Sequence, residues 1–390
     1  MLQCFHVFCP SSMRIAIVHP WFVMSGGGER VIDVLAEIYP QADFFVLMKS
    51  DKHLSKAMQG RRIQSTFLDR IPGAKRYYQH VMPLYPFAAQ SLDVSGYDLI
   101  ISSGGPAVKG VIVDQNAVHV HYCHTPVRFL WDQYSAWRKR LPWLVRPIFA
   151  LGASYLREWD FNSAQRIDAF IANSNYVAQR IQTYYRRKST TIYPPVDISR
   201  GYLDPHRENY YLSVGRLVHG KRTELLIEAC NRLKRKLLIA GTGPEEQRLR
   251  AAAGSTVEFL GRVDDTRLAS LYARAKAFLF AADDDFGIAP VEAQAFGLPV
   301  IAYGKGGALE TVVGDDSGLP PTGTFFYEQT ADSLCKAILH FEENQGSFEP
   351  QHIRKHSESF STEVFRQRMA DFIQECYSNE IQKRQRKPCS

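Results

Sequence analysis

The sequence lacks the paired cysteines of a secreted, disulfide-stapled protein. Its seven cysteines are dispersed along 390 residues, and no two of them form a C-x-x-C pair. An odd and scattered set of this kind is typical of a reducing compartment. We therefore expect a cytoplasmic protein.

Long hydrophobic runs are also missing. No apolar stretch reaches the roughly 18 residues that a membrane-spanning helix needs. The nearest, residues 141–156, is interrupted by Pro142, Arg146 and Pro147. Residues 1–12 lack the charge pattern of a signal peptide, and we expect them to be an extra, disordered segment before the first strand.

The chain has no large excess of charge of either sign. The net charge is only +7, and the chain has no basic-aromatic array and no zinc-finger spacing. Nucleic acid is therefore not an expected partner. A modest positive charge instead suits an anionic ligand or an anionic membrane surface.

Short apolar strands alternate with helical segments in two series. We predict strands at 14–19, 44–48, 97–103, 117–122 and 169–174, and then at 210–214, 236–240, 257–260, 277–280 and 300–303. Pro194 and Pro195 separate the two series and predict a stiff linker. The pattern predicts an α/β fold of two doubly wound, Rossmann-like domains facing a central cleft.

The domain boundaries follow from these two series. We expect a first domain at residues 13–192 and a second at 193–360. Residues 361–380 form a predicted C-terminal helix that returns to the first domain, and residues 381–390 form a basic, frayed tail.

The segment from Asp283 to Glu292 places two carboxylates at a predicted junction of a strand and a helix. Pro290 suits the first helical position. Glu292 then falls in the first turn, where the helix dipole favours a carboxylate. Because carboxylates accept several hydrogen bonds, Asp284 and Glu292 suit a hydroxyl-rich ligand. The triplet Asp283-Asp284-Asp285 also imitates a cation-binding motif, which stays open as an alternative.

Basic and glycine-rich turns follow other strands of the second series. Arg216 and Lys221 present positive charge at a strand end, where a diphosphate could lie. Gly306-Gly307 opens a predicted helix, where a phosphate can approach free N–H groups. Arg262-Val263 follows a further strand end and could offer backbone groups to a base edge. Each turn taken alone could also be purely structural.

The first series has its own glycine turn and a histidine cluster. The turn Gly26-Gly27-Gly28 does not continue to the last glycine of the dinucleotide-binding motif G-x-G-x-x-G, which counts against a nicotinamide enzyme. His119, His121 and His124 look like metal ligands. On a strand, however, His119 and His121 share one face and His124 lies beyond the strand end. We therefore expect one active-site histidine, His124, and no metal.

The region 129–161 is rich in tryptophan and basic residues. Two interpretations stay open, namely a surface that lies on a membrane and a helical pair packed on its own domain. The residues concerned are Trp131, Trp137, Trp143, Trp159, Arg138, Lys139, Arg140 and Arg146.

Together these features resemble the retaining glycosyltransferases of family 4, which have the GT-B fold. The resemblance runs from Met13 to about Asn379. It rests on Asp284 and Glu292 around Phe286-Gly287, on Gly215-Arg216 with Lys221, and on Gly306-Gly307. The segment His121-Tyr122-Cys123-His124-Thr125-Pro126, followed by Trp131-Asp132, is similar to bacterial mannosyltransferases of polysaccharide assembly.

The resemblance implies a hexosyltransferase that needs no metal cofactor. The implied donor is a nucleotide-sugar, GDP-mannose by the likeness to mannosyltransferases, and the acceptor is a hydroxyl of a glycan or a lipid-linked oligosaccharide. The implied location is the cytoplasm, at the inner face of the membrane if the aromatic-basic region docks there. A UDP-sugar donor and a non-catalytic sugar-nucleotide-binding protein are the alternatives.

The resemblance also implies roles for single residues. Asp284 would contact the donor sugar, and Glu292 would hold the ribose hydroxyls. Arg216 and Lys221 would neutralise the leaving diphosphate, and His124 would lie near the transferred sugar. Further residues would line the donor or, for the last two, the phosphate and acceptor: Phe286, Gly287, Ile288, Ala289, Arg262, Val263, Gly306, Gly307, Gly27 and Gly28.

Two positions depart from the family pattern. The family usually has Glu where this chain has Asp284, whose side chain is shorter by one carbon–carbon bond, about 1.5 Å. The usual proline-aromatic pair before the lysine is His219-Gly220 here. The first departure bears on the rate of transfer or on the choice of donor sugar.

Overall fold

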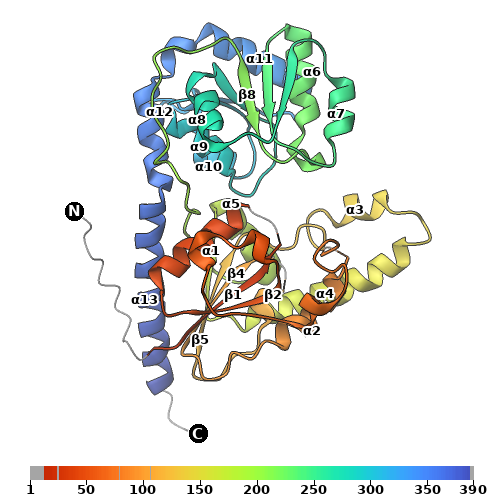
Figure 1. Cartoon of the computed structure of the whole chain (residues 1–390), viewed down its shortest axis with the longest axis vertical. Helices are drawn as coiled ribbons and strands as arrows, with labels where there is room; N and C mark the ends of the chain where they lie inside the picture. Colours follow the sequence, from red (N-terminus) through yellow and green to blue (C-terminus); the bar gives the residue numbers. More distant parts are fainter. Residues whose placement is uncertain (1–12, 24–25, 79, 106, 387–390) are drawn as a thin grey trace. The chain divides into compact units, whose positions relative to one another are not determined.

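The chain folds into two α/β units in a computed structural model that describes residues 13–23, 26–78, 80–105 and 107–386 (Figure 1). The first unit consists of the chain up to Pro195 together with the chain from Phe365 onward, and the second is Val196–Val364. The disorder predicted for residues 1–12 and the end of the predicted basic tail, residues 387–390, fall outside the described residues.

The first unit is built on a parallel sheet that contains seven strands within the described residues, in the order β3-β2-β1-β4-β5-β6-β7. The central strands are buried almost from end to end, so they appear in the sequence as continuous apolar runs. The strands are β1 Ile15–Phe22, β2 Asp43–Lys49, β3 Ile63–Ser65, β4 Leu99–Gly104, β5 Val118–Cys123, β6 Ala169–Ala172 and β7 Thr190–Thr191.

Helices cover this first sheet. The amphipathic helix α1 buries Val31, Ile32 and Leu35 in the same cluster as Ile17 of β1. Helix α5 begins at a side-chain cap, since the backbone N–H of Val177 donates to Ser174 Oγ at 3.1 Å. The helices are α1 Gly27–Ile38, α2 Tyr85–Gln90, α3 Tyr134–Arg140, α4 Arg146–Gln165 and α5 Asn175–Tyr185.

The second unit has a parallel sheet with six strands among its residues, all of which are described, in the order β10-β9-β8-β11-β12-β13. Apolar clusters lie on both faces of it. The strands are β8 Tyr211–Val214, β9 Leu237–Ala240, β10 Val257–Gly261, β11 Ala277–Phe280, β12 Val300–Tyr303 and β13 Gly323–Phe326. The helices are α6 Thr223–Leu233, α7 Glu246–Ala252, α8 Asp265–Arg274, α9 Ile288–Ala295, α10 Ala308–Thr311, α11 Ala331–Glu343 and α12 Pro350–Ser357.

Both sheets reverse their order of connection at one place. In the first sheet, β1 lies between β2 and β4, and in the second, β8 lies between β9 and β11. The loops that leave the two central strands of such a sheet run in opposite directions. A crevice therefore opens at their carboxyl ends, which is where ligands bind in this class of sheet.

The C-terminal helix α13, Thr362–Arg386, packs against the first unit (Figure 1). Phe365, Met369 and Ile373, spaced four residues apart, are buried in the cluster that contains α1 and β1. The predicted helix end at 380 and frayed tail from 381 are wrong for the described part. The helix continues because Arg384 donates to the carbonyl oxygen of Ala117 at 2.7 Å and to Asp168 at 3.0 Å.

We expect Ile373→Ala to lower the free energy of unfolding of the first unit by about 2–5 kcal/mol, because it leaves a cavity between α13 and the sheet. All five tryptophans lie before Pro195 in the first unit, so their fluorescence follows the unfolding of this unit in urea. The exposed neighbour Gln374→Ala is the matched control and should change the midpoint little. Equal midpoints for the two variants would contradict the packing described here.

Candidate active site

The loop after β8 is fixed against its neighbour by backbone contacts. The N–H of Gly215 donates to the carbonyl oxygen of Ala240 at 3.0 Å, and that of Leu217 donates to Thr242 at 3.0 Å. A Cβ at Gly241 would collide with the carbonyl oxygen of Gly215, so only glycine allows this approach. The loop leads into a short 3-10 turn, His219–Lys221.

Arg216 and Lys221, both predicted site residues, line one pocket within the second unit. The other side of this pocket is formed by Leu279 and the residues that follow β11, Ala281 and Ala282. Two cationic side chains therefore lie at the carboxyl ends of β8 and β11, where the order of the sheet reverses. A diphosphate is the ligand that such a pair suits.

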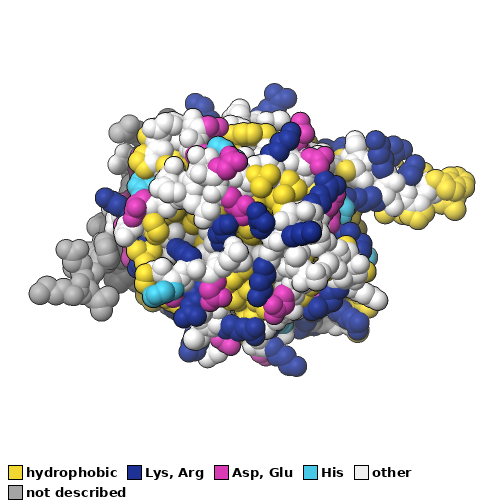
Figure 2. Space-filling model, turned by 90° about the horizontal axis from the view of Figure 1, so that it is seen from above, with side chains coloured by type: hydrophobic (Ala, Val, Ile, Leu, Met, Phe, Trp, Pro, Cys, Tyr) yellow, Lys and Arg dark blue, Asp and Glu magenta, His cyan; other side chains and the backbone are white. Residues whose placement is uncertain are grey.

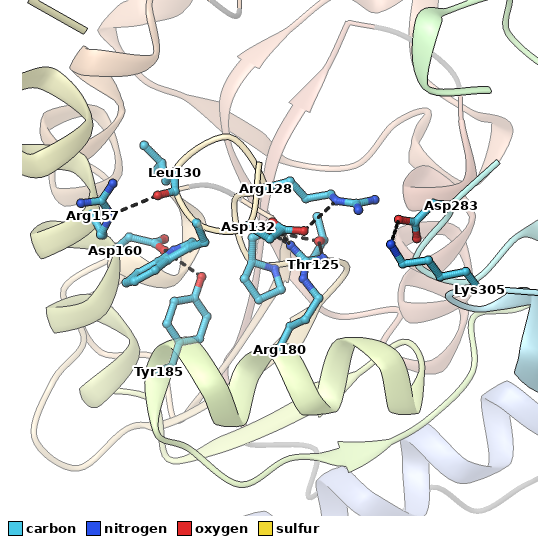
Figure 3. A network of polar contacts seen from close by, with 12 residues as sticks. Thr125, Arg128, Leu130, Asp132, Arg157, Asp160, Arg180, Tyr185, Asp283 and Lys305 are labelled. Atoms are coloured by element: carbon cyan, nitrogen blue, oxygen red, sulfur yellow. Dashed lines mark hydrogen bonds and ion pairs between the residues drawn. The ribbon is translucent and has the colours of Figure 1, made fainter. Parts of the chain in front are cut away.

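Lys221, which lines this pocket, forms an ion pair with Asp284 of the loop after β11. The Lys221 ammonium group also lies 5.9 Å from the centre of the Phe280 ring. Asp283 forms a second ion pair, 3.2 Å from Nζ of Lys305 to Oδ2 (Figure 3). Two carboxylates of the Asp283-Asp284-Asp285 triplet are thus engaged by lysines. The arrangement favours a ligand-contacting role for Asp284 over chelation of a cation by the triplet.

Helix α9 begins two residues earlier than predicted. Gly287 has a left-handed backbone, with φ of 86°, and α9 runs from Ile288. Pro290 is therefore the third helical residue, not the first. It still costs no hydrogen bond, because the first four N–H groups of a helix have no partner within it. Glu292 lies beyond the first turn and not within it as predicted, which weakens the helix-dipole argument for its placement.

Glu292 is held by a side chain that the sequence did not single out. The hydroxyl of buried Tyr272 donates to Glu292 Oε2 at 3.4 Å, and the Tyr272 ring stacks on Phe296 at 5.4 Å. Ile288 and Ala289 provide the first N–H groups of α9. Phe286 is buried and packs edge-on against Phe360 at 5.8 Å.

Gly306 and Gly307 lie against the backbone of the loop that follows β11. A Cβ at Gly306 would meet the carbonyl oxygen of Asp284, and one at Gly307 would meet the backbone of Phe286. The N–H of Gly307 donates to the carbonyl oxygen of Asp284 at 2.9 Å. The predicted free N–H at Gly307 is therefore wrong, and the helix that follows, α10, has only four residues. Close packing explains these glycines directly.

Arg262 and Val263 follow β10, the edge strand, two strands away from β8. Arg262 is exposed and Val263 is partly buried. The N–H of Gly241 donates to the carbonyl oxygen of Gly261 at 2.8 Å, which ties this strand end to the neighbouring loop. No contact joins Arg262 to Lys221 or Asp284 among the interactions of the described residues, so their common role stays a prediction.

In the first unit, the structure brings His124 and Gly28 together. Gly27 and Gly28 are the first residues of α1, and a Cβ at Gly28 would lie 3.7 Å from His124 Cε1. Ser103 Oγ lies 2.9 Å from His124 Nε2. His19 Nδ1 donates to the Ser103 carbonyl oxygen at 2.9 Å. His19 and Ser103 were not predicted, although each stands at or near the carboxyl end of an apolar strand.

The four histidines that lie in β1, in β5 and directly after β5 are neutral at pH 7. Burial lowers the pKa of His124 to about 4 and, helped by the nearby His124, that of His19 to about 3. His119 and His121 share one face of β5, as predicted, where Ser102 Oγ lies 2.7 and 2.8 Å from their ring nitrogens. A neutral His124 can donate or accept a hydrogen bond but cannot neutralise a phosphate.

The loop after His124 is tied to the core by buried charges (Figure 3). Arg180 donates to Thr125 Oγ1 at 2.6 Å, to the Pro126 carbonyl oxygen at 3.1 Å and to Asp132 at 2.9 Å. Trp131 donates to Asp160 at 2.9 Å. Asp160 also pairs with Lys109, which is only 1% exposed. The Thr-Pro and Trp-Asp elements of the motif therefore position the loop.

Each of two family models matches one unit. The model described as Glycosyltransferase Family 4 matches residues 25–200, and the model described as Glycosyl transferases group 1 matches residues 197–360. Similar solved structures include a sucrose-phosphate synthase from Thermosynechococcus elongatus, 17% identical with a TM-score of 0.70, which covers 94% of this chain and 100% of that one. An Anabaena protein in complex with UDP and glucose is 18% identical with a TM-score of 0.66, covering 93% and 99%.

The curated relatives match the chain over smaller shares of their length than these solved structures do. The α-1,3/1,6-mannosyltransferase of Kluyveromyces lactis is 25% identical over 58% of this chain and 55% of its own length. That of Candida glabrata is 22% identical over 85% of each chain. A GDP-mannose-dependent mannosyltransferase of Corynebacterium glutamicum is 34% identical over 32% of this chain and 35% of its own. The chain thus spans about half of the Kluyveromyces lactis protein and about a third of the Corynebacterium glutamicum protein, but 85% of the Candida glabrata protein.

The two parallel sheets and the structural matches define a GT-B fold, as predicted. The two family matches together span residues 25–360. The first unit thus carries a Glycosyltransferase Family 4 domain, and the second carries a Glycosyl transferases group 1 domain.

The buried histidines predict that acid destabilises the first unit. Their pKa values are about 3 to 4 in the folded chain for His19, His119 and His124, against about 6.5 in the unfolded chain. The free energy of unfolding is unaffected by these histidines above pH 6.5. It decreases as the pH falls toward 4, because the unfolded chain binds protons at a higher pH than the folded chain. The expected slope is about 1.4 kcal/mol per pH unit for each histidine.

Urea unfolding followed by tryptophan fluorescence between pH 7 and 5 measures this slope. His119→Gln should reduce the slope, whereas His53→Gln, at an exposed site in the same unit, should not. An unchanged slope in His119→Gln would show that this histidine does not titrate on unfolding.

Proposed function

We propose that the chain is a retaining mannosyltransferase, which moves mannose from GDP-mannose to a hydroxyl of a glycan or lipid-linked oligosaccharide in polysaccharide biosynthesis. The observation that supports it most is the pocket in which Arg216 and Lys221 lie at the carboxyl ends of β8 and β11, with Asp284 paired to Lys221. Cations suited to a diphosphate and a carboxylate suited to a sugar hydroxyl therefore lie side by side at the carboxyl ends of β8 and β11.

The choice of donor rests on the names of relatives. The Kluyveromyces lactis and Candida glabrata proteins are mannosyltransferases, and the Corynebacterium glutamicum protein is described as GDP-mannose-dependent. A UDP-sugar is the second candidate, because the Anabaena protein was solved with UDP and glucose. Arg262 and Val263, at the end of β10, are the residues we propose to contact the base.

The reaction breaks the bond between C1 of the sugar and the diphosphate oxygen, and forms a bond from C1 to the acceptor oxygen on the same face. The electron pair of the broken bond leaves with the diphosphate, whose growing charge Arg216 and Lys221 would stabilise. The acceptor proton passes to the departing phosphate oxygen, so charge and atoms balance. No step in this scheme uses a metal ion.

The ion pair between Lys221 and Asp284 suggests how a donor is received. Without a donor, each charge compensates the other. With a donor, Lys221 would turn to the diphosphate and Asp284 would accept hydrogen bonds from the sugar. Because the side chain of Asp284 is shorter than that of Glu, its carboxylate stays close to Lys221. We infer that this is why Asp can replace the usual Glu.

The remaining predicted residues take supporting roles in this proposal. Glu292, held by Tyr272, would accept from the ribose hydroxyls, and the N–H groups of Ile288 and Ala289 would face the phosphates. Neutral His124 would bind the sugar or acceptor by a hydrogen bond, beside Gly28. An acceptor carried by a lipid would place the enzyme at the inner face of a membrane.

We expect Arg216→Ala to lower transfer by about 10²–10³-fold, because one preorganised charge on the leaving group is lost. Arg216 is exposed, so the variant should fold normally. Mass spectrometry of GDP-mannose consumption and GDP release measures the rate, and NMR of the product reports whether the anomeric configuration is kept. Arg232→Ala, at a 50% exposed arginine near the end of α6, is the control. Near-normal turnover in Arg216→Ala would refute the assigned role.

Thermal unfolding with a panel of donors tests the base and the sugar. A ligand at 100 times its dissociation constant stabilises the folded chain by about 2.7 kcal/mol. We expect GDP-mannose and GDP to raise the melting temperature of the second unit, and Glu292→Gln to reduce the shift. A shift with UDP-glucose and UDP alone would select the second candidate. No shift with any nucleotide would refute the proposed function.

A further inference from the structure

The hairpin of α3 and α4, residues 134–156, exposes an unusual amount of apolar side chain. Of the 17 large hydrophobic residues that are exposed within the described ranges, seven lie in this stretch. Trp143, Leu144, Ile148 and Leu151 are between 66% and 74% exposed. Isolated exposed hydrophobics are ordinary, but a contiguous set marks a surface that binds something.

Among the described residues, the inner face of the hairpin packs against its own unit. Ala153 and Leu156 of α4 are buried in a cluster with Val127 and Leu130. Tyr134 of α3 stacks on Phe149 of α4 at 5.6 Å. This agrees with the interpretation of the region as a packed helical pair, but it accounts for one face alone.

The outer face of α4 is a second apolar stripe. Ile148, Leu151 and Tyr155 are spaced three and four residues apart, which places them on one side of the helix. Trp143 and Leu144 extend this stripe into the tip between the two helices. A helix that is apolar on two faces is stable when the second face is also covered by an apolar environment.

The tip is held in place by backbone contacts of arginines. Arg146 Nε donates to the carbonyl oxygen of Leu141 at 3.1 Å, and its NH2 group donates to that of Lys139 at 3.2 Å. At the base, Arg157 Nε donates to the Leu130 carbonyl oxygen at 3.0 Å. The stripe is therefore presented on a supported element.

The charge of the hairpin has a single sign. Residues 134–156 contain four basic side chains and no acidic one. Arg138, Lys139 and Arg140 end α3, next to the tip. In Figure 2, the projection at the right has hydrophobic side chains at its end and basic side chains beside them. Apolar and tryptophan side chains flanked by cations match the interface of an anionic bilayer.

We propose that this hairpin docks the enzyme on an anionic lipid membrane. Trp143, Leu144, Ile148 and Leu151 enter the interfacial region, and Lys139 and Arg140 contact lipid phosphates. Among the described residues no helix is long and apolar enough to cross a bilayer, so the contact is peripheral. The proposal deepens the location given under the proposed function but does not need the donor chemistry.

Co-sedimentation with vesicles measures the contact. We expect the full chain to bind vesicles of 70% phosphatidylcholine and 30% phosphatidylglycerol and to bind pure phosphatidylcholine far less. The double variant Ile148→Ser, Leu151→Ser should bind the anionic vesicles at least about tenfold more weakly. The matched control is Leu319→Ser, Leu339→Ser, at exposed apolar sites of the second unit. Equal binding by the two double variants would overturn the proposal.

Charge substitutions give a second, independent measurement. Lys139→Gln and Arg140→Gln should each weaken binding by about fivefold, since a basic residue near an anionic surface contributes about 1 kcal/mol. Lys355→Gln, an exposed lysine of the second unit, is the control. Brominated lipid should quench tryptophan emission, and Trp143→Phe should remove most of the quenching. Quenching in Trp143→Phe that equals the quenching in the native chain would overturn the proposed orientation.

Two further outcomes separate this proposal from its competitors. Sedimentation velocity without lipid should show one species, and a dimer abolished by Ile148→Ser, Leu151→Ser would assign the surface to a second copy instead. The thermal shift with GDP-mannose should be the same in this variant and in the native chain, because neither substituted residue is among those proposed to bind the donor. Loss of vesicle binding with an intact shift would confirm the hairpin, and loss of the shift in the native chain would refute the donor assignment alone.

Discussion

In a parallel sheet all strands end at the same edge, and this constraint gathers the polar residues of each unit. Arg216 and Lys221 follow β8 and Asp284 follows β11, at the place where the second sheet reverses its order. In the first sheet, Ser103 lies near the end of β4, which borders the reversal, and His124 follows the next strand, β5. The central strands are filled mainly by apolar side chains, and the charged groups of the proposed site lie where a strand stops. The position of the proposed site thus follows from how the chain packs its core.

Glycines let the strand-end loops approach closely enough for the charges to meet. Gly241 admits the carbonyl oxygen of Gly215, and Gly306 and Gly307 admit the backbone around Asp284. The ion pair of Lys221 with Asp284 then joins two loops separated by 63 positions in the sequence. In the first unit, the loop after His124 is held in place by the buried charged residues Arg180 and Asp160, which bond to Asp132 and Trp131. Each unit thereby holds its site residues before any ligand arrives.

The sequence was most informative where residues form regular, buried elements. All ten predicted strands coincide with strands of the structure, because long apolar runs leave little choice of conformation. The strands β3, β7 and β13 were missed, since each contains at most two apolar residues, whereas the predicted four-residue strands contain three or four. Pro290 misled the prediction of the start of α9, because a proline fits any position of a first helical turn.

The sequence by itself determined the α/β class, the family resemblance and the residue types that we propose to bind a diphosphate and a sugar. These depend on local composition and on fixed spacing, which one chain displays directly. Tertiary structure alone decided that Lys221 pairs with Asp284, that Gly307 gives its N–H to the protein, and that His124 stays neutral beside Ser103. It also decided which face of α4 is left exposed. The reason is physical, since ion pairing, burial and desolvation depend on distances between residues that are remote in the chain.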